Sequence, residues 1–121
     1  MRKYSLFIII LIIVAAAVAV LIINPGKKAS AELNNFAACL AGKNITMYGA
    51  ESCSWCQKEK ANFGSAFEQV PYVECPDEPQ KCIALGIEGT PTWIFPDGRK
   101  LVGYQGLQKL SEASGCSLPQ N

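Results

Sequence analysis

Two cysteines separated by two residues, Cys53 and Cys56, lie where an apolar strand pattern gives way to a helical one. The strand pattern covers residues 45–50, and the helical pattern continues to about Val70. The first turn of a helix presents unpaired N–H groups and the positive end of the helix dipole, which favour a thiolate over a thiol. The arrangement therefore predicts a redox pair in which Cys53 is the nucleophile and Cys56 the resolving thiol.

An unbroken apolar run occupies residues 6–23, behind two basic residues. As a helix it would be roughly 27 Å long, enough to span the hydrocarbon core of a bilayer. The run is longer than the apolar core of a signal peptide, and a lysine pair separates it from the small-residue triplet that ends at Ala31. We therefore expect an uncleaved signal anchor over residues 1–23, with cleavage after Ala31 and a secreted domain as the alternative.

The rest of the chain divides into a linker and one domain. Residues 24–31 are mostly polar, contain a Pro-Gly step and predict a juxtamembrane linker. Residues 32–121 are enough for one small domain with its own core. That part holds seven basic and ten acidic residues, a net charge of −3, so we expect no nucleic-acid partner.

All six cysteines follow the apolar run, and the chain contains no histidine. A small domain so rich in cysteine predicts an oxidising compartment, which places it on the extracytoplasmic side of a cell membrane. The absence of histidine excludes Cys-His dyads, Ser-His-Asp triads and zinc sites that need imidazole. The chemistry expected of this chain is therefore sulfur chemistry.

Hydrophobic periodicity and turn residues give the order of the remaining elements. They predict a helix, a strand, the helix that begins at the cysteine pair, a second strand, a short helix, a hairpin and a last helix. The respective ranges are 32–41, 45–50, 53–70, 71–75, 77–85, 93–104 and 107–114.

This order, with Thr90-Pro91 ahead of the hairpin, resembles the thioredoxin superfamily over residues 43–115. The resemblance implies an α/β fold, a central mixed sheet flanked by helices, here preceded by one N-terminal transmembrane helix. It also implies that Pro91 is cis and lies against the active-site disulfide, with the backbone of Thr90 facing a client. Trp55, inside the cysteine motif, is expected to modulate access to this groove.

Shorter segments resemble the thioredoxin-like domain that is fused to bacterial vitamin K epoxide reductase homologues. They cover residues 36–40, 47–50, 63–67, 72–75, 89–93 and 114–116. In those fusions the domain exchanges disulfides with a quinone-linked membrane partner. One predicted anchor helix stands in place of the membrane enzyme here, so the resemblance implies such a partner on a separate chain.

Two features depart from the family pattern. The dipeptide between the active-site cysteines is Ser54-Trp55, where relatives usually carry proline or histidine. The buried carboxylate of thioredoxins falls here on Met47, and no acidic residue or histidine is evident to take the proton from Cys56. Whether the pair oxidises, reduces or isomerises disulfides therefore stays open.

The other four cysteines allow three pairings. In the thioredoxin fold the first strand begins, and the last helix ends, at the sheet edge remote from the active site. The resemblance therefore implies a structural disulfide between Cys39 and Cys116, which leaves Cys75 to pair with Cys82. A redox relay through Cys75 and Cys82 is the functional alternative for the second pair.

Two other classes of function compete with the redox prediction. Cys53, Cys56, Cys75 and Cys82 could ligate a metal, although the second spacing is wider than zinc ribbons use. A disulfide-stapled interaction module without turnover could instead present Trp55 and Trp93 as a peptide-binding face.

We nevertheless expect a membrane-anchored, extracytoplasmic thiol–disulfide oxidoreductase that acts on client proteins. Its electron carrier is the disulfide of Cys53 and Cys56, so neither a bound cofactor nor a metal is expected.

Overall fold

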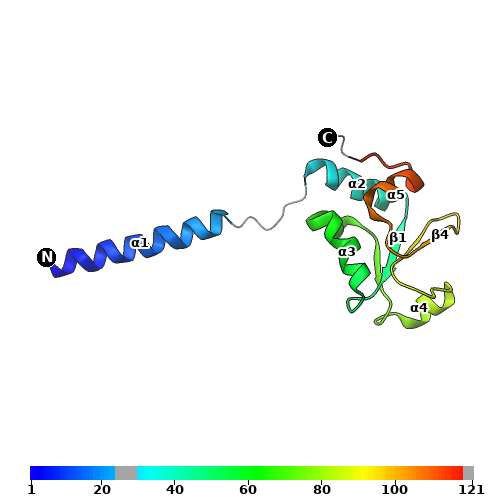
Figure 1. The fold of residues 1–121 in the computed structure, drawn as a ribbon, viewed down its shortest axis with the longest axis horizontal. Coiled ribbons are helices and arrows are strands. Elements are labelled where there is room, and N and C mark those ends of the chain that lie inside the picture. The colour runs from blue at the N-terminus through cyan, green and yellow to red at the C-terminus, as the bar shows by residue number, and fades with distance from the viewer. Residues whose placement is uncertain (24–29, 119–121) are drawn as a thin grey trace.

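The computed structural model describes residues 1–23 and 30–118, with side chains for residues 1–20 and 30–118. Helix α1, Arg2–Ile23, contains the apolar run, and residues 24–29 of the predicted linker lie outside the described residues (Figure 1). By length and composition α1 can cross a membrane, a test that a signal sequence also passes. Ser30 caps the next helix, α2 (Ala31–Gly42), by accepting a hydrogen bond from the Leu33 N–H at 3.2 Å.

Four short strands form one mixed sheet in the order β2-β1-β3-β4. Strand β1 pairs in parallel with β2 and antiparallel with β3, which forms an antiparallel hairpin with β4. Helices cover both faces of this sheet. This is a thioredoxin-like α/β fold. The strands are β1, Thr46–Gly49; β2, Tyr72–Glu74; β3, Thr92–Ile94; and β4, Lys100–Val102.

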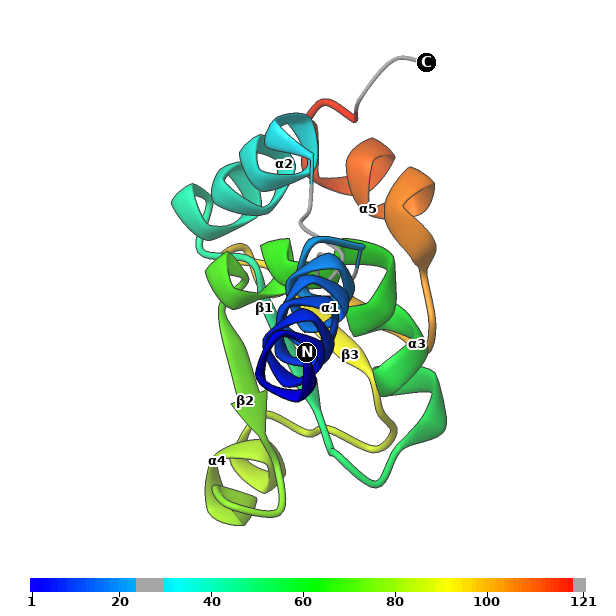
Figure 2. The same ribbon diagram turned by 90° about the vertical axis from the view of Figure 1, so that its left-hand side faces the viewer.

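The two faces of the sheet bury separate sets of side chains, because successive residues of a strand point to opposite sides. Met47 and Trp93 join the larger core under α2, α3 (Ser54–Phe63) and α5 (Gly106–Ser114). Tyr48 joins the smaller cluster under α4 (Pro79–Ala84). Figure 2 shows α4 beside the end of β2, apart from α2 and α5. The cysteine pair at the start of α3 therefore belongs to the larger core.

The predicted helix through Val70 is wrong in its second half. Helix α3 ends at Phe63, and a 3-10 helix, η1, continues over Gly64–Gln69. Gly64 has φ of +56°, a conformation that only glycine adopts readily, so the α-helical ladder stops there. The apolar periodicity persists past the break because Ala66 still faces the core.

Candidate active site around Cys53 and Cys56

The cysteine pair lies at the N-terminus of α3, directly after the turn that follows β1. Cys53 is the N-cap residue, with an extended backbone, and its sulfur accepts a hydrogen bond from the Cys56 N–H at 3.1 Å. Its own N–H donates to the Ala50 carbonyl at 3.1 Å, which closes the turn. The sulfur of Cys53 thus occupies the place where a serine or aspartate oxygen usually caps a helix, and where negative charge is stabilised.

The two cysteines form a disulfide with a Cα–Cα distance of 5.2 Å, but their environments differ. Cys56 is fully buried, whereas Cys53 is half-buried at the edge of the larger core. A partner molecule can therefore reach only the Cys53 sulfur without unfolding the helix. Chemically, this asymmetry separates an attacking thiolate from an internal thiol.

The Thr90–Pro91 peptide bond is cis, as the resemblance to thioredoxins implied, and it stands beside the cysteine pair. The Thr90 carbonyl oxygen lies 3.6 Å from the Cys53 sulfur. The Thr92 hydroxyl donates to the Gly89 carbonyl at 2.6 Å, and the Gly103 N–H donates to the Pro91 carbonyl at 2.7 Å. These bonds hold the loop in place against the Cys53 sulfur.

Trp55 is half exposed, at 54%, on the surface of α3 next to the cysteine pair. Its ring lies 5.7 Å from that of Tyr104, and the Lys58 ammonium sits over both rings at 4.9 and 4.8 Å. Trp93 is instead fully buried in the core. The joint face of Trp55 and Trp93 suggested by the interaction-module hypothesis is therefore not present.

A buried carboxylate, Glu59, was not singled out from the sequence. Its side chain is fully buried and accepts hydrogen bonds from the Gln105 N–H at 2.7 Å, the Gly106 N–H at 2.9 Å and the Trp93 indole N–H at 3.5 Å. Glu59 thus ties α3 to the start of α5. The signal was its spacing, three residues after the buried Cys56 on the same helix face.

A second carboxylate, Glu74, lies at the end of β2 and forms a network with Tyr72. The Tyr72 hydroxyl donates to Oε2 of Glu74, and the Glu51 N–H donates to Oε1 at 2.7 Å. The hydrogen bond from Tyr72 is the main reason that the pKa of Glu74 is lowered. Burial, followed by the hydrogen bond to Glu74, raises the pKa of Tyr72 well above its ordinary value. At neutral pH this pair is therefore an ionised carboxylate and a neutral phenol.

The remaining cysteines form two further disulfides. Cys39 on α2 is joined to Cys116 after α5, with a Cα–Cα distance of 5.9 Å, and Cys75 after β2 is joined to Cys82 on α4, at 5.8 Å. The four cysteines considered as metal ligands are thus divided between two disulfides. Within residues 1–23 and 30–118, no group of three His, Cys, Asp or Glu side chains is arranged to hold a metal ion.

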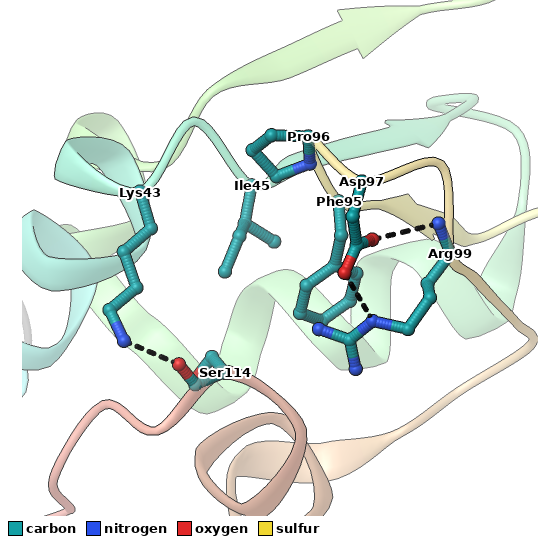
Figure 3. A pocket seen from close by; sticks show the side chains of 7 residues that line it. All are labelled: Lys43, Ile45, Phe95, Pro96, Asp97, Arg99 and Ser114. Atoms are coloured by element: carbon teal, nitrogen blue, oxygen red, sulfur yellow. Dashed lines mark hydrogen bonds and ion pairs between the residues drawn. The ribbon is translucent and has the colours of Figure 1, made fainter.

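A pocket of about 250 Å³ lies away from the cysteine pair, where β1 begins and β3 ends (Figure 3). Its charged side chains already have partners. The Lys43 ammonium donates to the Ser114 carbonyl at 2.6 Å, and the Arg99 guanidinium pairs with Asp97 at 2.7 Å. None of the residues that line the pocket belongs to the cysteine motif or to the loop around Pro91.

Known proteins share parts of this sequence and fold. Over 83 residues the chain is 43% identical to Thiol-disulfide oxidoreductase LTO1 of Arabidopsis thaliana, a match that covers 61% of this chain and 22% of the relative. The chain thus corresponds to less than a quarter of the length of that relative. Among solved structures, the glutaredoxin from Methanosarcina mazei Go1 has a TM-score of 0.45 and 24% identity, covering 59% of this chain and 77% of that chain. No protein-family model matches.

The sheet topology and the similarity to a thiol–disulfide oxidoreductase both support the thioredoxin superfamily. The matched share of the relative is too small to transfer its whole activity.

Proposed function

We propose that this chain is a thiol–disulfide oxidoreductase that exchanges disulfides with client proteins through Cys53 and Cys56. The observation that carries the proposal is the asymmetry of the pair, with an accessible sulfur at the helix N-cap and a fully buried one behind it. The similarity to a named thiol–disulfide oxidoreductase supports the same class of reaction.

The reaction follows from the positions of the two sulfurs. In the reducing direction, the Cys53 thiolate attacks a client disulfide, forms a mixed disulfide and releases one client thiolate. Cys56 then loses its proton and attacks the Cys53 sulfur, so that the second client sulfur leaves and the intramolecular disulfide forms. The enzyme loses two electrons and the client gains them, and the oxidising direction is the reverse sequence.

Thr90, Pro91 and Trp55 are the proposed walls of the client groove. The support for Thr90 and Pro91 is the carbonyl oxygen 3.6 Å from the Cys53 sulfur, held by a loop with its own hydrogen bonds. The support for Trp55 is its exposed ring beside the motif, backed by Tyr104. An extended client chain could stack an apolar side chain on Trp55 while its sulfur approaches Cys53.

We further propose that α1 anchors the protein in a cell membrane, with the α/β unit on the extracytoplasmic side. Two disulfides outside the active site support an oxidising compartment. The cap that Ser30 provides to α2 favours an uncleaved chain, because cleavage after Ala31 would remove it, at a cost of about 1 kcal/mol. By the resemblance to domains fused to vitamin K epoxide reductase homologues, a quinone-linked membrane protein is the proposed redox partner.

The test is to trap the mixed disulfide. In Cys56→Ala, the first attack proceeds but resolution cannot, so client proteins should accumulate on Cys53 in the native membrane and be released by dithiothreitol. The matched control, Cys53→Ala, lacks the accessible sulfur and should trap nothing. If Cys56→Ala accumulates no mixed disulfides under conditions where the chain is folded and present in the membrane, the chain is not an oxidoreductase of this type.

A further inference from the structure

A phenol hydroxyl reaches the neighbourhood of the buried Cys56 sulfur because β1 ends in a residue without a side chain. A Cβ placed on Gly49 would lie 3.1 Å from the Cys56 sulfur and 3.3 Å from the Tyr72 hydroxyl oxygen. The sulfur and the hydroxyl oxygen therefore both lie within 3.3 Å of one point beside Gly49. The parallel register of β1 and β2 sets this arrangement, since it pairs Met47 with Tyr72 and Gly49 with Glu74.

The hydrogen bonds around Tyr72 determine what its hydroxyl can offer to Cys56. Its single hydrogen is donated to Oε2 of Glu74, whose other oxygen accepts the Glu51 N–H at 2.7 Å. A phenol whose hydrogen is committed can act toward a neighbour only as an acceptor. The lone pairs of the Tyr72 oxygen are thus available to a thiol hydrogen on Cys56 and not to a thiolate.

We propose that Tyr72 and Glu74 form a proton relay that takes the thiol proton of Cys56 when this residue resolves the mixed disulfide. This inference rests on the proposed oxidoreductase function. In the step, the Cys56 proton passes to the Tyr72 oxygen while the Tyr72 proton passes to Oε2 of Glu74. The Cys56 sulfur then bonds to the Cys53 sulfur, the bond from Cys53 to the client breaks, and the client leaves as a thiolate. Glu74 afterwards releases the proton to water.

The charges around the relay agree with this role. Besides Glu74, the groups facing the phenol are Glu51 and Asp77, both negative, and Lys60 of α3, whose ammonium lies 3.8 Å from the centre of the Tyr72 ring. The negative groups around the phenol outnumber Lys60, and negative charge near a buried sulfur disfavours its thiolate. The pKa of Glu74 is lowered, which keeps it an ionised acceptor at neutral pH and makes its protonation transient.

The relay accounts for a feature that the cysteine motif alone leaves unexplained. The Cys56 N–H and the helix N-terminus face the Cys53 sulfur, where they would stabilise a thiolate once the pair is reduced. The proposed reaction requires the opposite of Cys56, whose thiol should be protonated at rest and lose its proton only during resolution. The pair of Tyr72 and Glu74 on β2 meets both requirements, since its negative charge disfavours a resting thiolate and its carboxylate accepts the proton during resolution.

The experiment separates the two chemical steps with one probe. The full chain in mild detergent, with the Cys53–Cys56 pair reduced and the other two disulfides intact, is mixed with 2,2′-dipyridyl disulfide. Attack by Cys53 releases one pyridine-2-thione, and resolution by Cys56 releases a second, so the absorbance trace has two phases. Rates are measured between pH 5.5 and 8 for the wild type, Tyr72→Phe, Glu74→Gln and the control Tyr48→Phe. Tyr48 lies on the opposite face of β1, in the cluster with Cys82.

In the wild type we expect the second phase to be nearly independent of pH, because ionised Glu74 is present throughout. In Tyr72→Phe and Glu74→Gln it should slow by about 10²-fold at neutral pH, a usual contribution of general acid–base catalysis. In these two variants the rate of the second phase should then rise nearly tenfold per pH unit, because only hydroxide removes the thiol proton. The first phase should change by less than about twofold, and Tyr48→Phe should match the wild type in both phases.

A second phase in Tyr72→Phe and Glu74→Gln with the wild-type rate and pH profile would overturn the relay while leaving the oxidoreductase proposal intact. Failure of the underlying function has a different signature. A wild-type protein that releases no pyridine-2-thione, or only the single equivalent expected of Cys56→Ala, refutes the exchange reaction itself.

Discussion

Replacing Glu59 by alanine removes the carboxylate that accepts hydrogen bonds from three N–H donors. These donors come from distant positions in the chain. Two are the backbone N–H groups of Gln105 and Gly106, which are partly buried, and the third is the indole of Trp93, which is fully buried. A buried donor left without a partner costs about 1–3 kcal/mol. Taking the lower end for all three donors gives a loss of about 3 kcal/mol, a fall in melting temperature of about 12–24 °C for a domain of this size. Glu59→Gln keeps an oxygen acceptor and should lose about half as much.

Urea unfolding of the oxidised full chain, followed by tryptophan fluorescence, measures this loss. Both tryptophans lie in the α/β unit, so α1 does not contribute to the signal. The control is Glu112→Ala, an exposed acidic residue of α5 whose loss should stay within about 0.5 kcal/mol. Equal unfolding midpoints for Glu59→Ala and Glu112→Ala would refute the reasoning, because the buried carboxylate would then contribute no more than a solvated one.

Three further results are expected. Replacing both Cys39 and Cys116 by serine opens a loop with a sequence separation of 77. In the chain-entropy model this lowers the free energy of unfolding by about 4.5 kcal/mol, which urea unfolding measures, while disulfide exchange at Cys53 persists. An unchanged urea midpoint would contradict a stabilising role for this disulfide. The pKa of Glu74 is lowered, so the stability gained from its ionised form is present above the ordinary glutamate pKa of about 4.3 and is lost as the pH falls through the folded-state pKa. The melting temperatures of wild type and Glu74→Gln should therefore converge on acidification, and a gap that widens speaks against the assignment. Trp55→Ala should lower kcat/KM for a peptide disulfide by about tenfold. Ile83→Ala, a still more exposed apolar control on α4, should lower it by less than about twofold; equal effects would remove Trp55 from the groove.

Local sequence patterns predict the strand, turn and helix that present the cysteine pair. The apolar and β-branched residues of β1 lead into a turn, and Cys53 takes the N-cap position that a redox cysteine needs. The break at Gly64 could not be inferred from periodicity, since apolar residues continue with the same spacing across it. Only the backbone conformation shows that glycine ends the helix there.

Long-range partners explain what the sequence left unassigned. The helical spacing of Glu59 places it on the face of Cys56, but the backbone N–H groups that donate to it lie 46 and 47 residues later in the chain. The approach of Tyr72 to Cys56 likewise depends on the parallel register of β1 and β2 and on the missing side chain of Gly49. The approach of Tyr72 has no local signal, and the spacing of Glu59 after Cys56 indicates only a shared helix face. For that reason the sequence suggested that no acidic residue stood ready to receive the Cys56 proton.

The central claim, that Cys53 and Cys56 form a reversible redox couple, is tested most directly by the reduction potential of that pair in the full chain. Equilibration in glutathione redox buffers, followed by thiol alkylation and mass mapping, assigns each potential to its cysteines. The account predicts that Cys53 and Cys56 open at a potential between about −120 and −270 mV, while Cys39 and Cys116 remain closed. An active-site pair that stays closed below about −300 mV, as structural disulfides do, would contradict the account and leave a disulfide-stapled module without redox turnover.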